Sequence, residues 1–496
     1  MLVAYNGSIM PLDDIRDARL EKLKTLRKAG IDPYPAKSWR THLISAVLAD
    51  FDTFAADRRT FVLAGRVMAK REHGGSTFIN IRDGSGSIQA YFKQDTLGDH
   101  DYKFFLETTD IGDFVEVSGT LFRTKKEEPT LEVEKYRILT KTLLPLPEKW
   151  HGLQDVEERF RKRYLDLLLN EEVRERFRTR AKVVKELRNF LDENGFLEVS
   201  TPTLQPLYGG ASARPFKTHL NALDIDLFMR IAPELYLKRL LVGGLDNVYE
   251  FTTNFRNEGM DRDHNPEFFA LEFYAAYKDL DWCMKFTEEM FQRVVSAAIG
   301  GTLVTYEDKN VQFGNNFDRL KFADLLKEYT GIDYDHATED ELAAKAKALG
   351  LQIDKTVTKA GLGDEIFKKA IRPKLVNPTF VTDWPVELLP LAKKTENPDY
   401  VGAFQFFAGG MELIKAFSEL NDPIDQHERF SAQESNRAKG DEEAQRMDND
   451  YVEALEYGMP PAAGWGLGLD RFIMLLTNTH SIREVILFPL MKPRDN

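Results

Sequence analysis

Short runs of alternating apolar and polar residues fill the chain from about residue 60 to 145. Glycine, proline, aspartate and serine separate these runs, a pattern typical of strands joined by turns. In TFINIRD, Phe78, Asn80 and Arg82 alternate with two isoleucines, so Phe78 falls on a polar face. Five such runs predict an OB-type β-barrel, a fold that binds single-stranded nucleic acid on its strand face.

Helical periodicity flanks the predicted barrel and dominates much of the chain after it. Leucines recur at helical spacing after Asp13, and a Pro-containing connector then leads to the barrel. A Pro-rich linker comes after the barrel, and a larger α+β domain takes up the rest of the chain. The predicted divisions are a helical extension 1–58, the barrel 59–146, a linker 147–165, and a second domain 166–496 with a helical insertion at about 318–375. We assign no chemistry to the insertion.

A predicted hairpin with a long polar tip, residues 251–274, concentrates reactive side chains. Alternation places Asn254, Arg256 and Glu258 on one face of the outgoing strand, and Phe268, Ala270, Glu272 and Tyr274 on one face of the returning strand. An arginine fork grips phosphate or carboxylate, an aromatic ring stacks on a base, and carboxylates accept from amino groups. The alternative is an amphipathic hairpin with a solvated charged face.

The alternative leaves one residue of the hairpin without an explanation. Glu272 lies inside the apolar run FFALEFYAAY, where a carboxylate is rarely buried without a partner. We therefore favour a hairpin that lines a binding cavity.

The composition of the chain limits which kinds of protein it can be. The 496 residues, 43% hydrophobic and 30% charged, predict two or three globular domains. No apolar run approaches the ~20 residues of a membrane span, and the N-terminus lacks the basic-then-apolar pattern of a secretion signal. The single cysteine, Cys283, excludes an internal disulfide and a zinc site with several cysteine ligands. We therefore expect a cytoplasmic protein without a membrane partner.

The formal net charge of −13 argues against indiscriminate nucleic-acid binding, and no DNA partner is expected. Basic residues nevertheless cluster in RFRKR (159–163) and RERFRTR (174–180). A solvated helix face with ion pairs to nearby glutamates and an RNA-facing surface explain these clusters equally well.

Three motifs in order resemble those of the class II aminoacyl-tRNA synthetases. Arg256, Glu258, His264 and Phe268 match motif 2. Residues 182–202 resemble motif 1, and residues 464–477, GWGLGLDRFIMLLT, resemble motif 3, with Arg471 at the start of a helix. The HIGH and KMSKS signatures of class I enzymes are absent from the sequence. The resemblance implies an antiparallel catalytic sheet flanked by helices.

Four further segments narrow the resemblance to the lysyl-tRNA synthetases of subclass IIb: residues 164–168, 209–244, 378–393 and 416–430. The similarity extends from about residue 15 to the C-terminus. It implies that ATP and L-lysine form lysyl-adenylate, that lysine then passes to the 3′ end of tRNA(Lys), that Mg²⁺ assists, and that the enzyme is a homodimer.

The resemblance also implies roles for individual residues. Arg256, Arg471 and His264 would be catalytic. The residues implied for ATP binding are Arg256, Glu258, His264, Phe268, Glu412 and Arg471. Those implied for lysine binding are Gly210, Glu234, Arg256, Glu272, Tyr274, Lys415, Phe417 and Glu419. Metal binding is implied for Glu412, and anticodon binding for Arg66, Phe78 and Gln89.

Two positions depart from the family pattern. Gln405 stands where a carboxylate usually helps to hold Mg²⁺, and Lys415 stands where an asparagine usually contacts the substrate carboxylate. One negative charge is lost and one positive charge is gained, which together equal the charge of one Mg²⁺. We expect fewer metal ions than usual, with the Lys415 ammonium taking part of their place.

Other functions stay open at this point. The departures at Gln405 and Lys415 are also compatible with a class IIb paralogue of changed amino-acid or metal use, or with an RNA-binding regulatory protein. An aspartate or asparagine ligase of the same subclass is disfavoured by Glu272 and Glu419, because an acidic substrate requires basic residues there. Relatives that attach lysine to a translation factor lack the N-terminal barrel.

Overall fold

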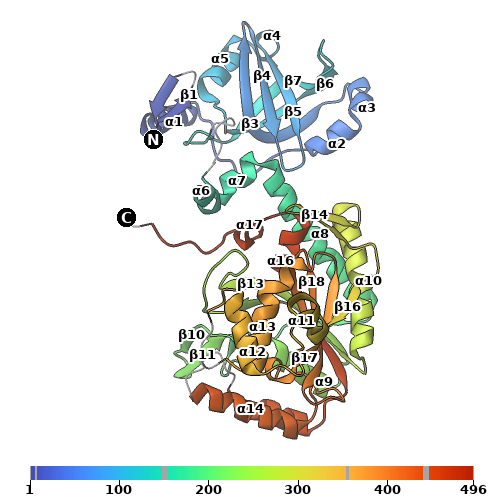
Figure 1. The fold of residues 1–496 in the computed structure, drawn as a ribbon. Helices are drawn as coiled ribbons and strands as arrows, with labels where there is room; N and C mark the ends of the chain where they lie inside the picture. Colours follow the sequence, from blue (N-terminus) through green and yellow to red (C-terminus); the bar gives the residue numbers. More distant parts are fainter. Residues whose placement is uncertain (1, 6–7, 148–154, 353–356, 439–445, 495–496) are drawn as a thin grey trace. The chain divides into compact units, whose positions relative to one another are not determined.

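The computed structural model describes residues 2–5, 8–147, 155–352, 357–438 and 446–494 (Figure 1). The chain divides into two compact units, Met1–Gln154 and Asp155–Asn496. Part of the predicted linker, residues 148–154, lies outside the described residues. Among the helices in the described ranges, none is long and apolar enough to span a bilayer.

The first unit contains the predicted five-stranded barrel, which is confirmed. Its strands close in the order β3-β4-β5-β7-β6. The strands are β3 (Phe61–His73), β4 (Ser76–Arg82), β5 (Ser87–Lys93), β6 (Phe114–Arg123) and β7 (Pro129–Thr140). Alternate side chains such as Ile79 and Ile81 are buried in the barrel core, so the remaining side chains of each strand face outward.

The rest of the first unit consists of a short hairpin and five helices. They are β1 (Leu2–Tyr5), β2 (Ser8–Pro11), α1 (Leu12–Lys28), α2 (Ile44–Ala49), α3 (Phe51–Ala56), α4 (Gln94–Leu97) and α5 (Asp99–Thr108). Buried charged groups tie α1 to the end of the barrel: Arg19 donates to Thr142 Oγ1 at 2.8 Å, and Lys22 pairs with Asp110 at 2.7 Å.

An eight-stranded sheet organises the second unit in the order β16-β17-β18-β19-β20-β13-β12-β8. The strands are β16 (Asp318–Lys321), β17 (Thr379–Pro385), β18 (Tyr400–Ala408), β19 (Met411–Ser418), β20 (Ala462–Gly468), β13 (Glu267–Ala276), β12 (Asn247–Phe255) and β8 (Leu197–Glu198). Neighbours from β17 to β12 are antiparallel, whereas the edge pairs β16–β17 and β12–β8 are parallel.

Helices cover both faces of this sheet. On one face, α8 (Glu171–Glu193), α10 (Leu280–Ile299) and α16 (Leu469–Leu476) bury a large apolar core with Leu271 and Phe273 of β13. On the other face, α9 (Glu234–Val242) and α15 (Asn449–Glu456) pack against Tyr274 of the same strand. Alternation along β13 therefore separates an apolar face from the polar face that carries the candidate residues.

The insertion begins with β16, the edge strand of the main sheet, and continues with α11 (Phe322–Thr330), α12 (Glu339–Ala348), α13 (Lys359–Ala370) and the 3₁₀ turn η1 (Arg372–Lys374). Figure 1 shows α11, α12 and α13 grouped together, and they share a core with β17 and β18.

The remaining elements of the second unit connect these layers. They are β9 (Leu204–Gln205), β10 (Lys217–Leu220), β11 (Ile225–Met229), β14 (Leu303–Tyr306), β15 (Lys309–Gln312), α6 (Val156–Arg161), α7 (Arg163–Leu169), α14 (Pro423–Ala438), α17 (Ile482–Val485) and the 3₁₀ turn η2 (Val386–Leu388).

The predicted hairpin is extended where expected, with one difference at its tip. β12 ends at Phe255, so Arg256 and Glu258 lie just beyond the outgoing strand and not on it. The Arg256 amide still donates to Pro266 O at 2.8 Å, which keeps its side chain close to the paired strands.

Candidate active site

Strand register aligns three positions noted in the sequence, with one glycine between them, across the sheet. Glu272 on β13 lies opposite Gly466 on β20, which lies opposite Lys415 on β19, which in turn lies opposite Gln405 on β18. Directly opposed residues share one face of a sheet, so these side chains surround the same region although they are far apart in sequence.

Glycines on β20 leave room above this region. A Cβ built at Gly464 would lie 1.7 Å from Glu419 Oε1 and 2.5 Å from Tyr274 Cε1. A Cβ at Gly466 would meet no atom closer than Glu272 Cγ, at 3.5 Å. Gly464 is therefore required for Glu419 and Tyr274 to occupy their positions, whereas Gly466 is not under the same restriction.

Arg256 and Phe268 meet at the tip end of the hairpin. The guanidinium carbon of Arg256 lies 5.0 Å from the centroid of the Phe268 ring. Burial lowers the pKa of Arg256, and the carboxylates of Glu258 and Glu272 act in the opposite direction. Its Nε atom is buried and, within the described part of the chain, has no hydrogen-bond partner. A guanidinium in this state can accept an anionic ligand.

Arg471, on α16, is held beside the hairpin tip. Its Nη2 atom donates to Nε2 of His264 at 2.8 Å, and its Nη1 atom donates to the backbone oxygen of Glu412 at 3.3 Å. Because an arginine only donates, His264 Nε2 accepts, and Nδ1 carries the proton that it donates to Asp261 at 2.8 Å. His264 is thus positioned to orient Arg471.

Two carboxylates and a buried ammonium form the opposite end of the site. Glu419, 1% exposed, follows β19, and Glu234 is the first residue of α9. Lys238, four residues after Glu234, lies between them: its Nζ is 2.5 Å from Glu234 Oε1 and is also ion-paired with Glu419 Oε2. Gly210, at φ +86°, packs so closely on Glu234 that a Cβ there would lie 2.9 Å from the Glu234 Cβ.

Tyr274 links this end to Glu272. Its hydroxyl donates to Glu272 Oε2 at 3.3 Å. Burial raises the pKa of Glu272 to about 8, and the charge of Glu234 adds to the effect. Burial likewise raises the pKa of Glu419 to about 8, against the opposing pull of Lys238. Carboxylates with pKa values displaced so far are typical of binding and catalytic sites.

Glu412 lies among cations. The Nζ atom of Lys415 is 3.7 Å from Glu412 Oε1. Burial would raise the pKa of Glu412, yet Lys415, Arg471 and Arg372 together hold it below its ordinary value. The Gly410 amide donates to Leu375 O at 2.9 Å, which brings η1 and its Arg372 to the tip of the β18–β19 hairpin. The insertion therefore contributes charge to the site, which we did not expect from its sequence.

The three barrel residues also share a face. Phe78 stacks on Tyr91 with ring centroids 4.6 Å apart, and Gln89 lies opposite Asn80 on the neighbouring strand. Arg66 donates to Gly112 O at 3.0 Å and is half-buried. All three project from the outer side of consecutive strands β3, β4 and β5.

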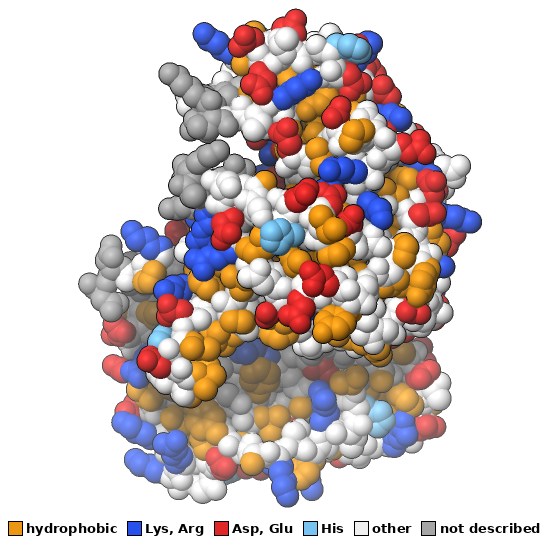
Figure 2. Space-filling view, turned by 90° about the horizontal axis from the view of Figure 1, so that it is seen from below, with side chains coloured by type: hydrophobic (Ala, Val, Ile, Leu, Met, Phe, Trp, Pro, Cys, Tyr) orange, Lys and Arg blue, Asp and Glu red, His pale blue; other side chains and the backbone are white. Residues whose placement is uncertain are grey.

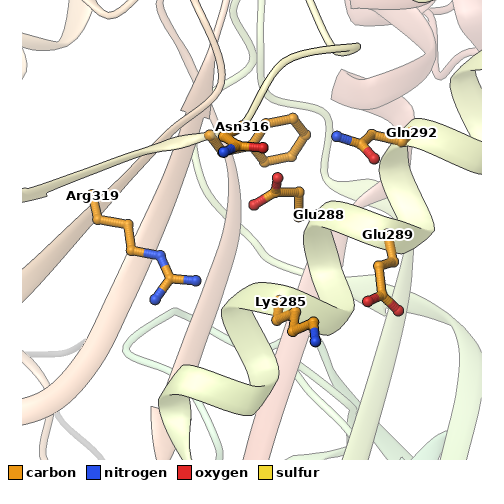
Figure 3. Close-up of a pocket in the computed structure, with 7 residues that line it drawn as sticks. Lys285, Glu288, Glu289, Gln292, Asn316 and Arg319 are labelled. Carbon is orange, nitrogen blue, oxygen red and sulfur yellow. The ribbon is translucent and has the colours of Figure 1, made fainter.

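Two surface cavities are not part of this constellation. One, of about 400 Å³, is lined by Lys285, Glu288 and Glu289 of α10 together with Asn316 and Arg319 (Figure 3). The other, of about 480 Å³, lies along Val199–Pro202 and α9. Neither is lined by a residue that the sequence assigned to a substrate, a metal or the anticodon. Figure 2 shows that acidic and basic side chains are intermixed over one face of the molecule. This face therefore carries no single large acidic patch.

Sequence reasoning missed Lys238. The signal was present, because Glu234 and Lys238 are spaced i, i+4 on an amphipathic helix. Such a pair is usually exposed, and only the packing of α9 against β13 and Glu419 makes this one internal.

Comparisons with known proteins agree with this arrangement. A family model described as tRNA synthetases class II (D, K and N) matches residues 155–492, and one described as OB-fold nucleic acid binding domain matches residues 61–139. The chain is 51% identical to a lysine–tRNA ligase of Carboxydothermus hydrogenoformans, over 98% of this chain and 99% of the relative.

Other bacterial relatives are similarly close. Identity is 49% to a lysine–tRNA ligase of Moorella thermoacetica, over 97% of this chain and 99% of the relative. It is also 49% to a lysine–tRNA ligase of Roseiflexus sp., over 98% of this chain and all of the relative. At this identity and coverage, the chain belongs to the lysine–tRNA ligase family of class II tRNA synthetases.

Proposed function

We propose that this protein activates L-lysine with ATP and transfers it to the 3′ end of tRNA(Lys). The observation that carries the proposal is the buried group formed by Glu419, Glu234 and Tyr274, which Glu272 links to Arg256 and its aromatic neighbour. Two carboxylates at one end match the two ammonium groups of lysine. The Arg256 guanidinium at the other end, whose Nε has no hydrogen-bond partner among the described residues, matches the lysine carboxylate and a phosphate.

In the first step, an oxygen of the lysine carboxylate attacks the α-phosphorus of ATP. The bond from that phosphorus to the β-phosphate oxygen breaks, and pyrophosphate leaves. Such a displacement requires positioning and charge neutralisation more than a protein base. We assign Arg256 to bridge the carboxylate and the α-phosphate, and Arg471, oriented by His264, to the adenine face and the γ-phosphate.

The adenine ring is assigned to the space between Phe268 and Arg471, with its amino group donating to Glu258. Glu419 and Tyr274 receive the ε-ammonium of lysine, and Glu234 with the Gly210 backbone receives the α-ammonium. Glu272 supports Tyr274, and Phe417 and Lys415 line the same face of β19. In the second step, a ribose hydroxyl of the tRNA terminus attacks the lysyl carbonyl, and AMP leaves.

Mg²⁺ is typical of this family, and Glu412 is the residue assigned to hold it. The donor set supports few ions, because among the described residues no group of three or more His, Cys, Asp or Glu side chains is arranged to bind a metal. Lys415, 3.7 Å from Glu412, supplies positive charge at the same place. Because about half of the Lys415 side chain is exposed, water screens this contact, which contributes roughly 0–1 kcal/mol.

The metal proposal is tested with the Gln405→Glu/Lys415→Asn double variant. Mg²⁺ is titrated in the adenylation reaction, and Mn²⁺ bound with a non-hydrolysable ATP analogue is counted by electron paramagnetic resonance. We expect the variant to bind more ions and to depend more steeply on Mg²⁺. Equal ion counts and equal metal dependence would reject the proposal that Lys415 replaces part of the metal array.

On the barrel, Arg66, Phe78 and Gln89 are assigned to the anticodon. Stacked aromatic rings on the outer strand face support this role, since single-stranded bases bind by stacking. An RNA-binding regulatory protein is the second candidate, favoured only by the substitutions at Gln405 and Lys415.

A homodimer is also proposed, through the segment that resembles motif 1. Edge strand β8 supports it, because Leu197 is 52% exposed there and the adjoining cavity is lined by Val199, Pro202, Leu240 and Leu245. Light scattering at the elution peak should give twice the chain mass of 56.9 kDa. A single-chain mass at micromolar concentration would contradict the dimer.

The decisive experiment is amino-acid-dependent exchange of pyrophosphate into ATP. We expect lysine to support exchange, ornithine and arginine to support far less, and aspartate and asparagine none. If none of these amino acids supports exchange, the proposed activity is refuted and the regulatory protein is favoured.

A further inference from the structure

Lys238 is a fully buried cation that has no place in the proposed reaction. Its side chain is 0% exposed, and it projects from α9 into the space between two carboxylates. Its Nζ atom lies 2.5 Å from Glu234 Oε1 and contacts Glu419 Oε2. Each of the two carboxylates assigned to the substrate thus has one oxygen already bound by the protein.

The second oxygen of Glu419 is differently placed. Both Glu419 oxygens are buried without a hydrogen-bond partner within the ranges that the structure describes, and Oε2 is the one that contacts the Lys238 ammonium. Oε1 faces the open side of Gly464 and lies near the ring of Tyr274. An unsatisfied carboxylate oxygen is costly in a buried site, so this atom is suited to receive a donor from a ligand.

Without Lys238, the pocket would bring two carboxylates together in a poorly solvated space. Such a pair neutralises itself by binding a proton. Burial and the charge of Glu234 both act in this direction on Glu419, raising its pKa, and the Lys238 ammonium is the group that opposes them. An uncharged Glu419 would lose most of its attraction for an ammonium group.

We propose that Lys238 is a positioning residue for amino-acid recognition: it holds one oxygen each of Glu234 and Glu419, opposes protonation of Glu419, and leaves Glu419 Oε1 for the ε-ammonium of lysine. This inference rests on the proposed function of the same pocket. Lys238 does not react and contributes no donor to the transferred group.

Several other groups face Glu419 and must be considered in a pH profile. They are Glu234 on α9, Tyr274 on β13, Cys283 on α10 and Tyr451 on α15, and Glu272 joins them through its hydrogen bond with Tyr274. Burial raises the pKa values of Tyr274, Cys283 and Tyr451, so these groups stay neutral near pH 7. Glu272 has a pKa raised to about 8 and is the group whose titration overlaps that of Glu419.

The test compares Lys238→Met and Lys238→Arg with the parent in pyrophosphate exchange from pH 6 to 9. Removing one partner of a buried charge pair leaves the other charge buried and unpaired, so the KM for lysine should rise about 30-fold or more at pH 7 in Lys238→Met. The KM for ATP should change little. The KM for lysine should continue to fall up to pH 9 in this variant, whereas that of the parent levels off earlier.

Three controls separate positioning from folding. Lys238→Arg should restore most of the lysine affinity and the parental pH midpoint. Arg239→Met, on the same helix but paired with Asp448 at 2.9 Å, should leave both KM values unchanged. Glu272→Gln identifies any part of the profile that belongs to Glu272.

The outcomes distinguish the inference from the function on which it rests. If the parent shows no lysine-dependent exchange, the proposed function fails. If the parent is active but Lys238→Met keeps the parental pH midpoint, or loses lysine and ATP affinity equally, the inference about Lys238 is wrong. If Lys238→Met does not fold, the pH midpoint of Lys238→Arg decides, because a displaced midpoint in this charge-preserving variant overturns the inference.

Discussion

The barrel of the first unit and the large sheet of the second unit present their candidate residues in opposite ways. On the barrel, Phe78 and Gln89 lie on the outer, half-exposed side of the strands, and the apolar side is buried. On the large sheet, both faces are covered, and Glu272 and Glu419 are 9% and 1% exposed. The same two-residue alternation thus produces an open platform in one unit and a closed pocket in the other.

The difference determines what each surface can do. Charged or polar groups on the open platform keep their water and need no internal partner, so they bind a long, flexible ligand with modest affinity per contact. Carboxylates in the closed pocket have lost their water, so they must be compensated by Lys238, Tyr274 or a ligand. Desolvation is costly, but it also makes the pocket selective, because a ligand that leaves a buried charge unpaired is rejected.

The largest expected effect comes from removing the carboxylate at the centre of the pocket. Glu419→Gln should lower kcat/KM for lysine about 10⁴-fold, the range over which a buried polar site rejects a mismatched partner. Pyrophosphate exchange measures it, with the KM for ATP as an internal control. A reduction of less than tenfold would show that the pocket is not as closed as its burial indicates.

The second test adds a single methyl group at two matched glycines. Gly464→Ala would place its Cβ 1.7 Å from Glu419 Oε1, whereas Gly466→Ala would place it 3.5 Å from Glu272. Displacing a binding group by about 1 Å can cost 10²-fold, so Gly464→Ala should reduce lysine-dependent exchange about 100-fold. Gly466→Ala should stay within a few-fold of the parent. Similar losses in both variants would contradict the assigned position of Glu419.

A smaller effect is expected on the open platform. Phe78→Ala should raise the KM for tRNA about 5- to 150-fold, equivalent to about 1 to 3 kcal/mol for a lost stacking contact. Exchange, which requires no tRNA, should be unchanged. Phe104→Ala, a half-buried aromatic on α5 off the strand face, serves as the matched control and should leave the KM for tRNA unaltered. Equal effects of the two variants would argue against an anticodon role for Phe78.

The smallest effect concerns stability. The pKa of Glu272 is raised to about 8 from an ordinary value of 4.5, so the folded protein retains a proton that the unfolded chain releases above pH 4.5. This contribution to stability is fully present below pH 4.5 and is lost as pH rises towards 8. The Tm of the ligand-free protein should therefore fall by a few degrees over this range. The fall should be shallower in Glu272→Gln, and identical slopes would exclude Glu272 as its source.

Much of the architecture is visible in local patterns. The five barrel strands follow from alternation and turn residues, and the polar face of β13 follows from the spacing of Phe268, Glu272 and Tyr274. The order of three motifs indicated the family. These features depend only on residues close together in the chain, because side chains repeat on one face every two residues in a strand and every 3.6 residues in a helix.

Packing between distant segments decided the rest. Lys238 and Glu419 are 181 positions apart in the chain, and nothing in the sequence around either residue indicates that they form an ion pair. The sequence of the insertion indicated no chemistry, yet η1 brings Arg372 to the β18–β19 hairpin, where its charge lowers the pKa of Glu412. The hydrogen bond from Arg471 to His264 spans 207 positions.

The sequence by itself thus determined which side chains face the same way along each strand and helix, because backbone geometry sets that locally. Which of those faces would be closed, and which charges would meet inside, was decided only by the tertiary structure, because desolvation and Coulomb interactions depend on distances in space and not along the chain.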